Sequence, residues 1–124
     1  MEIDSNKKML LLDRGNDLLG LAHELMFYGY SDMYITSDPG AVIEIAKLYK
    51  PDLVLLDFVF ANDNFEDICK QFRNENYLSH IPLIVVSTLY NKVFNCESGE
   101  SNTTYIKPID NQDFAIKIGY LMAS

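Results

Sequence analysis

Five short runs of apolar residues alternate with longer stretches in which apolar residues recur at helical spacing. The runs are residues 9–12, 33–36, 53–56, 83–86 and 104–106, and the second is the weakest. Short apolar runs followed by amphipathic helices are typical of parallel strands covered on both faces. Right-handed crossovers then favour a doubly wound sheet with strand order 2-1-3-4-5. We therefore predict a single α/β domain over residues 1–124, with its core at about 8–122.

Four of the five helical stretches carry a clear apolar stripe. The stripes are Leu18, Leu21, Ala22, Leu25 and Met26; Val42, Ile45, Ala46 and Tyr49; Phe65, Ile68, Cys69 and Phe72; and Phe114, Ile118 and Leu121. Asn16 and Asp38 are the expected N-caps of the first two helices, with Pro39 at the first helical position of the second. Residues 88–102 hold few apolar residues at this spacing, so we expect a helix there that is short, frayed or partly replaced by loop.

A polar residue stands where each of four runs ends. These residues are Asp13, Asp57, Ser87 and Lys107. Ligands of open α/β sheets bind beyond the carboxyl ends of the strands, and in the predicted order these four strands are neighbours. We therefore expect two carboxylates, a hydroxyl and an ammonium to meet at one edge. Asp57 is the clearest case, because it interrupts the apolar stretch "PDLVLLDFVF" and a buried charge is costly without partners.

These four side chains suit the transfer of a phosphoryl group to a carboxylate. A carboxylate can act as the nucleophile and form an acyl phosphate. Lys107 would offer a point charge to the phosphoryl oxygens, and Ser87 would donate a hydrogen bond to one of them. A structural interpretation stays open, in which Asp57 is satisfied by nearby backbone or by a salt bridge to Lys107, and Ser87 merely ends its strand.

The sequence resembles the receiver domain of bacterial two-component response regulators over nearly its whole length. The resemblance rests on "LLLD" with Asp13, "PDLVLLD" with Asp57, "LIVVST" with Ser87 and "YIKP" with Lys107. It implies a flavodoxin-like fold of five βα units, with Asp57 as the phospho-accepting residue and Ser87 and Lys107 in contact with the phosphoryl group. It also implies that the bond between Lys107 and Pro108 is cis.

The same resemblance implies partners. A histidine kinase or a phosphotransfer protein would donate the phosphoryl group in a phosphorelay, and a downstream protein would read the phosphorylated state. It also allows a homodimer formed through the last strand and helix. The patterns of a flavin-binding protein and of a haloacid dehalogenase phosphatase are not met, so we expect a signalling phosphoprotein and not an enzyme.

The sequence departs from that family at its metal-binding acids. The family usually has two adjacent acids after the first strand, and they help to hold Mg²⁺; here the pair is Asp13 and Arg14. Because Mg²⁺ prefers carboxylates and waters in a strict octahedron, Asp13 and Asp57 would bind it weakly or not at all. Alternatively, the Arg14 guanidinium pairs with Asp57 and stands in for the metal.

The switch positions depart as well. The aromatic residue expected three places before the lysine is Thr104, and Tyr105 lies one place later. Thr88 stands where the family prefers a small residue, which would narrow access to Asp57. Pocket, switch and output face are thus altered together. A second hypothesis is therefore an atypical receiver that acts as an interaction module without phosphorylation.

The charge of the chain limits its partners further. Ten basic and 18 acidic residues leave a formal net charge of −8, which disfavours nucleic acid and anionic membrane surfaces as direct ligands. No apolar run approaches the length of a membrane span. The two cysteines, Cys69 and Cys96, have no CxxC spacing. We therefore expect a cytoplasmic protein with reduced thiols.

Overall fold

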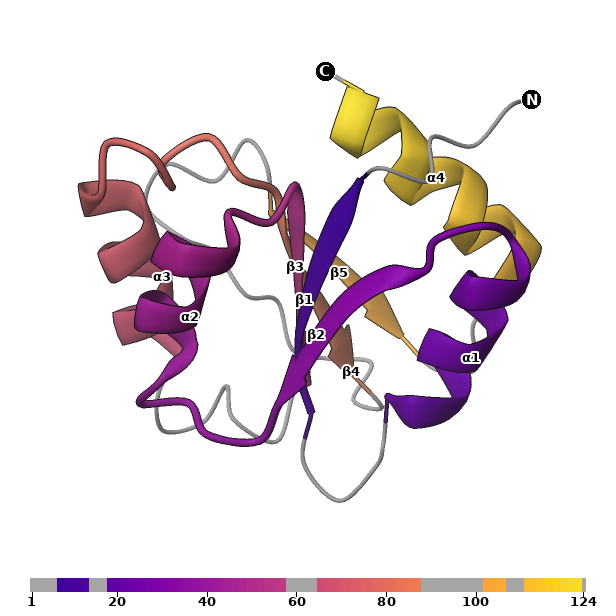
Figure 1. Cartoon of the computed structure of the whole chain (residues 1–124), viewed down its shortest axis with the longest axis horizontal. Coiled ribbons are helices and arrows are strands. Elements are labelled where there is room, and N and C mark those ends of the chain that lie inside the picture. The colour runs from indigo at the N-terminus through magenta and orange to yellow at the C-terminus, as the bar shows by residue number, and fades with distance from the viewer. Residues whose placement is uncertain (1–6, 14–17, 58–64, 88–101, 107–110, 124) are drawn as a thin grey trace.

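A five-stranded parallel sheet forms the middle layer of the protein, with two described helices on each face (Figure 1). The computed structural model describes residues 7–13, 18–57, 65–87, 102–106 and 111–123, of which 65–66, 87, 102–106, 111 and 123 are described by their backbone alone. Helices α2 and α3 cover one face of the sheet, and α1 and α4 cover the other. Within these residues, no helix has the length and hydropathy of a membrane span.

The strand order is the predicted one. The strands are β1 (Lys8–Leu12), β2 (Asp32–Thr36), β3 (Leu53–Asp57), β4 (Leu83–Ser87) and β5 (Asn102–Ile106). They lie in the order β2-β1-β3-β4-β5, and every neighbouring pair is parallel. β3 is buried along its whole length because helices cover both of its faces. β2 is an edge strand, and its exposed Tyr34 and Ile35 explain why its apolar run is the weakest.

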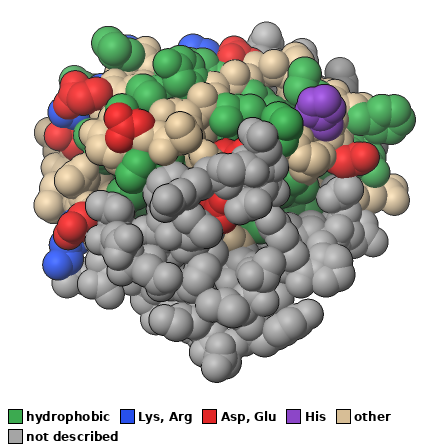
Figure 2. All heavy atoms as spheres, turned by 90° about the horizontal axis from the view of Figure 1, so that it is seen from below, with side chains coloured by type: hydrophobic (Ala, Val, Ile, Leu, Met, Phe, Trp, Pro, Cys, Tyr) green, Lys and Arg blue, Asp and Glu red, His purple; other side chains and the backbone are tan. Residues whose placement is uncertain are grey.

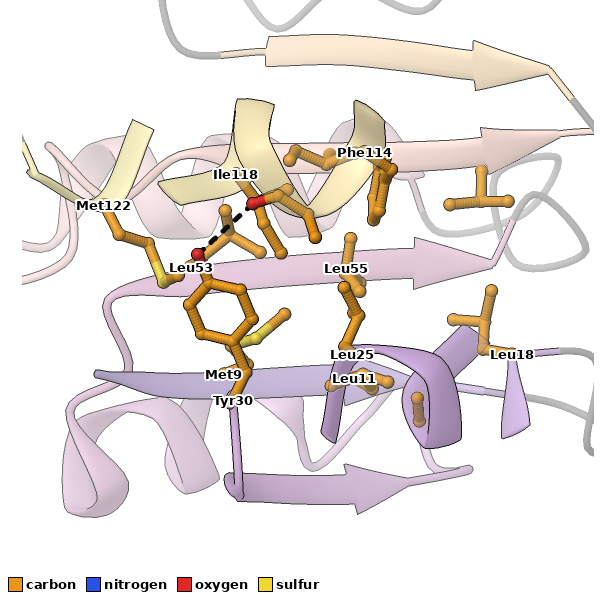
Figure 3. Close-up of a cluster of buried hydrophobic side chains, with 14 residues drawn as sticks. Met9, Leu11, Leu18, Leu25, Tyr30, Leu53, Leu55, Phe114, Ile118 and Met122 are labelled. Atoms are coloured by element: carbon orange, nitrogen blue, oxygen red, sulfur yellow. Dashed lines mark hydrogen bonds between the residues drawn. The ribbon is translucent and has the colours of Figure 1, made fainter. Parts of the chain in front are cut away.

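Alternate residues of the central strands feed two separate cores. Leu10 and Val54 pack with α2 and α3, whereas Leu11 and Leu55 pack with α1 and α4. This division follows from the strand itself, in which successive side chains point to opposite faces. Figure 3 shows the second core, where the side chains of β1 and β3 meet those of α1 and α4.

The helices use most of the predicted stripes. They are α1 (Leu19–Phe27), α2 (Val42–Tyr49), α3 (Phe65–Asn74) and α4 (Asn111–Ala123), the last of which corresponds to the fifth predicted helical stretch. Each of the four stripes faces the core, as one buried residue from each shows: Leu25, Ala46, Phe72 and Ile118. Met26 was wrongly assigned to the first stripe. It is 50% exposed because it lies on the solvent side of the last turn of α1. The weak helix expected within residues 88–102 falls largely outside the described residues.

Of the two predicted N-caps, the one of α2 is wrong and the one of α1 lies outside the described residues. α1 begins after Leu18, which has no side-chain cap, and Asn16 lies outside the described residues. α2 begins at Val42, later than predicted, and Ala41 is its N-cap. Asp38 is not the cap. Its Oδ1 accepts the N–H of Gly40 at 2.9 Å, and its carbonyl accepts the N–H of Ala41 at 3.1 Å, so the residues after it form a turn before the helix.

The state of Cys69 also differs from the prediction. It is the only cysteine among the described residues, it is buried between α3 and the sheet, and its side chain is disulfide-bonded. The expectation of a reduced thiol at this position was therefore wrong. A disulfide sulfur carries no proton and packs as an apolar atom, which suits the apolar face that the helical spacing predicts.

Tyr30 is the polar member of the second core. Its ring is buried, and its hydroxyl donates a hydrogen bond to the carbonyl oxygen of Ala115 in α4 at 3.2 Å (Figure 3). Burial raises the pKa of the Tyr30 phenol above its ordinary value of 10.0. This one contact joins the turn before β2 to a helix 85 residues further along the chain.

We predict that Tyr30→Phe lowers the free energy of unfolding by about 0.5–1.5 kcal/mol at neutral pH, because it removes a buried hydrogen bond and keeps the ring. Above pH 10 the unfolded state ionises at Tyr30 before the folded state does, so the advantage of the wild type should shrink. Urea unfolding at both pH values measures this. Tyr120→Phe is the control, since Tyr120 is 69% exposed. An advantage that grows with pH would contradict the assignment.

Candidate functional site at the carboxyl edge of the sheet

Asp13 and Asp57 lie next to each other where two neighbouring strands end. Leu12 of β1 pairs with Leu56 of β3, so the residues that follow them are adjacent in the parallel register. Both aspartates are only 5% exposed, and they are the buried charged residues of the described chain. Figure 2 shows this end of the sheet, called here the carboxyl edge, from below, with acidic side chains near its middle.

The next two strands end at the same edge. Asp57 pairs with Val86 of β4, and Ser87 pairs with Ile106 of β5. The backbone of Ser87 therefore lies one step beyond the row that contains Asp57, and β5 ends just before Lys107. The structure thus brings Asp13, Asp57 and Ser87 to one edge, as the sequence predicts from strand order.

Several predicted site residues are placed only in part. The backbones of Thr104 and Tyr105 lie in β5, opposite Val85 and Val86 of β4. Their side chains, and that of Ser87, are not described. The remaining ones, Arg14, Thr88, Lys107 and Pro108, lie outside the described residues. Their predicted roles, and the cis bond before Pro108, therefore stay predictions.

Asp13 makes two contacts that sequence reasoning missed. Its Oδ1 accepts the backbone N–H of Leu18 at 2.9 Å, and its own N–H donates to the carbonyl oxygen of Thr36 at 2.9 Å. Leu18 is the residue at which α1 begins, and a helix start carries unsatisfied N–H groups and a partial positive charge. Asp13 therefore fixes the start of α1 and the end of β2 relative to β1.

The signal for this contact is present in the sequence but is easily misread. An acid that ends a strand five residues before an apolar helix start can reach back to that helix. Asn16 is the nearer candidate, because asparagine is a preferred N-cap residue. The distant acid forms the buried hydrogen bond to Leu18.

Two adjacent buried carboxylates make the carboxyl edge electrostatically demanding. Each loses hydration, and their like charges disfavour each other unless cations or hydrogen-bond donors compensate. Such a place suits a ligand that brings positive charge, or an electrophile that consumes one carboxylate. Because β3 is buried on both faces, Asp57 is held in place by the sheet and by the strands beside it.

The fit of this edge to Mg²⁺ is limited. Within the described residues, no group of three histidine, cysteine or acidic side chains could hold a metal ion. Asp13 already uses Oδ1 to accept a hydrogen bond from Leu18. Proteins usually bind this ion through one or two carboxylates, and Asp13 and Asp57 could supply two. The donor set is therefore compatible with a weak site in which water supplies most ligands.

We predict that Asp13→Ala unfolds more easily than Asp13→Asn by about 1–3 kcal/mol. Both variants remove the charge, but only alanine leaves the buried N–H of Leu18 without an acceptor. Chemical denaturation measures the difference, and amide hydrogen exchange of Leu18 should be faster in the alanine variant.

The control pair is Asp38→Ala and Asp38→Asn, because Asp38 makes the same kind of contact, with Gly40, at an exposed site. Its two variants should differ by less than 1 kcal/mol, since water replaces a lost partner there. Equal stability of the two Asp13 variants would show that its bond to Leu18 does not hold α1.

Comparisons with known proteins agree with this fold. No family model matches the sequence. The receiver domain of a sensor histidine kinase from Pseudomonas aeruginosa superimposes with a TM-score of 0.77 at 14% identity, covering 95% of this chain and 98% of that chain. That structure contains a magnesium ion coordinated in its active-site cleft.

Two further structures give the same result. A two-component response regulator from Clostridium difficile has a TM-score of 0.76 at 16% identity, covering 94% of this chain and 96% of that chain. A chemotaxis response regulator from Vibrio cholerae has a TM-score of 0.76 at 15% identity, covering 93% and 98%. These likenesses span almost the whole of both chains in each case. The chain therefore has the fold of response-regulator receiver domains.

Proposed function

We propose that this chain is a receiver-type signalling module that accepts a phosphoryl group on Asp57 from a histidine kinase or a phosphotransfer protein. The observation that carries the proposal is the adjacency of two buried carboxylates, Asp13 and Asp57, at the ends of β1 and β3. An acidic residue that only keeps the protein surface hydrated would be exposed and would not lie beside a second buried acid. A nucleophile benefits from a position that the fold fixes.

The transfer would proceed in one displacement. A carboxylate oxygen of Asp57 attacks phosphorus, the bond from phosphorus to the donor imidazole nitrogen breaks, and its electron pair stays on that nitrogen. The ring leaves as neutral imidazole because its other nitrogen carries a proton. The product is an acyl phosphate on Asp57 and a histidine on the partner. Ser87, one step further along the neighbouring strand, would donate its hydroxyl hydrogen to a phosphoryl oxygen.

Positive charge is needed because the phosphoryl group adds anionic oxygens beside Asp13. Lys107 follows β5 directly and would supply part of it. Asp13 and Asp57 would hold Mg²⁺ weakly, and the ion would neutralise phosphoryl charge when bound. Arg14, which replaces an acid of the usual pair, would supply the rest through its guanidinium.

A second function has its own observation in favour. Arg14 stands where receiver domains usually have their second acid, and the described residues include no group of three side chains that could hold a metal ion. Such an edge suits an atypical receiver in which Arg14 and Lys107 neutralise Asp57 permanently. Partners would then read one constant surface, and the protein would act as an interaction module without phosphate.

In either form the protein would work through protein partners in the cytoplasm and would not be an enzyme. Thr104 and Tyr105 in β5 are the proposed switch positions, because their strand pairs with the strand that ends at Ser87. A change at the carboxyl edge would reach a downstream protein through them. A homodimer through β5 and α4 fits the same proposal.

We predict that acetyl phosphate adds one phosphoryl group to the wild type and none to Asp57→Asn. Intact-mass spectrometry of both proteins, with and without Mg²⁺, measures the adduct. Arg14→Asp restores the usual acidic pair, so it should bind Mg²⁺ more tightly and make phosphorylation depend more strongly on the ion.

Glu24→Gln is a matched control, because Glu24 is an exposed acid on α1 and its loss should change neither the adduct nor its Mg²⁺ dependence. Absence of an adduct in both the wild type and Arg14→Asp would exclude the phosphorelay proposal. Absence in the wild type with an adduct in Arg14→Asp would favour the module that works without phosphate.

A further inference from the structure

A cavity of about 490 Å³ opens at the other end of the sheet, far from Asp57. It lies between two segments, residues 47–52, which include the last turn of α2, and residues 75–81 before β4. Figure 1 shows these segments at the ends where β3 and β4 begin, called here the amino edge. A volume in this range suits a small ligand. The receiver-type proposal gives this cavity no role.

The acids of the cavity are already engaged, whereas two of its basic groups are not. Glu75 pairs with Lys47 at 3.3 Å, and Oδ2 of Asp52 accepts the backbone N–H of Lys8 at 2.9 Å. Lys50 and His80 are exposed and form no ion pair with any residue that the structure describes. The lining thus holds two lysines and two acids, and the ammonium of Lys50 is the one of these two lysine charges that is not paired with a described acid.

The backbone of Lys50 adds a second, independent observation. Lys50 has φ 56° and ψ 61°, and it is the one non-glycine residue with positive φ in the described part of the chain. It caps α2 in the left-handed conformation, where glycine is the usual residue because a Cβ atom costs about 1 kcal/mol. Strain of this kind is retained most often where the side chain has a task.

The walls of the cavity are apolar and fixed in place. Pro51, Leu78 and Ile81 are buried, and they line the cavity together with the charged groups. The guanidinium of Arg73 donates to the carbonyl oxygens of Ser79 at 2.9 Å and Ile81 at 3.2 Å, so the segment before β4 is held. Apolar walls with a few fixed polar groups are typical of ligand sites.

An exposed aromatic ring completes the lining. Tyr77 is 84% exposed although it lines the cavity. A ring in this position can stack on a flat apolar group that enters from solvent. The cavity thus combines an exposed ring, an apolar interior and an ammonium, that of Lys50, which forms no ion pair with the described residues.

We propose that this cavity binds a small organic anion, in which a carboxylate or phosphate monoester is attached to an aromatic body. The anionic group would lie by Lys50 and His80, and the ring would lie against Tyr77 and Leu78. Lys47 would not be the main anchor, because its ammonium is shared between Glu44 and Glu75. This site is separate from the carboxyl edge, so it stands whether or not Asp57 is phosphorylated.

Titration of the isotope-labelled chain with benzoate, phenyl phosphate and benzamide, followed by amide NMR, tests the proposal. An anionic probe should shift the amides of Lys50, Asp52 and His80. Benzamide, which has nearly the shape of benzoate but no charge, should bind at least tenfold more weakly. A response to phenyl phosphate alone identifies a phosphate monoester site, and a response to benzoate alone a carboxylate site. No response to either anion, or equal binding of benzamide, overturns the proposal.

Lys50→Gly separates binding from folding. Glycine relieves the left-handed strain, so this variant should be at least as stable as the wild type but should lose at least tenfold in affinity for the anion. Lys70→Ala is the control, because it removes an exposed lysine of α3 that does not line the cavity. Unchanged affinity in Lys50→Gly overturns the proposal.

Lys50→Asn is the second variant, because asparagine also tolerates this conformation and carries no charge. It should lose affinity to the same degree. Asp57→Asn should keep full affinity, which separates a failure at this cavity from a failure of the phosphorelay proposal.

Discussion

The parallel register between β1 and β3 decides where the two buried carboxylates of the candidate site lie. Leu12 pairs with Leu56, so the chain must place Asp13 beside Asp57 as soon as both strands leave the apolar interior. A shift of one residue in this register would move every side chain of one strand to the opposite face of the sheet, because alternate side chains pack in the two separate cores. The hydrophobic packing thus fixes the distance between the carboxylates more firmly than the carboxylates could themselves.

This arrangement places an electrostatic cost inside a stable scaffold. Two carboxylates that are each 5% exposed are poorly hydrated and adjacent, and such sites are tolerated where they serve a function. Part of the cost is offset locally, since Asp13 accepts the N–H of Leu18 at the positive end of α1. The same bond gives Asp13 a structural role at the start of α1. An acid that holds a helix start is less free to reorganise around a metal ion, whatever the residue that follows it.

The sequence predicts the scaffold well because its signals are redundant. Continuous apolar runs, helical stripes and crossover handedness all require the same sheet, and no single residue decides it. The errors occur where one residue was given a role by local preference. Asp38 looked like a helix cap and instead forms the turn before the helix, since the helix begins only where Val42 can reach the core. Met26 fitted the stripe of α1 by spacing, but it lies on the solvent side of the last turn, whose inward position is taken by Leu25.

The candidate site divides in the same way. The meeting of Asp13, Asp57 and Ser87 follows from strand order alone, so it was predictable. The bond from Asp13 to Leu18 was not, because it depends on the path of the loop between them. The prediction of a reduced thiol at Cys69 was wrong for a related reason, since spacing along one helix carries no information about a disulfide partner. Helical or strand periodicity predicts which face a residue occupies, and tertiary structure alone decides what it contacts there.

The direction of the helices explains why an acid suits one end of the sheet and a cation the other. Helices in a parallel α/β layer run against the strands, so helix starts gather at the carboxyl edge and helix ends at the amino edge. Acids are favoured near the first and cations near the second. Asp13 at the start of α1 and Lys50 at the end of α2 follow this rule. The dipole explains why a cation suits the end of α2, but any of the last few residues would satisfy it, and Lys47 already lies in that turn. A second lysine, at the one non-glycine position of positive φ among the described residues, therefore calls for a cause beyond the helix, and the cavity beside it provides one.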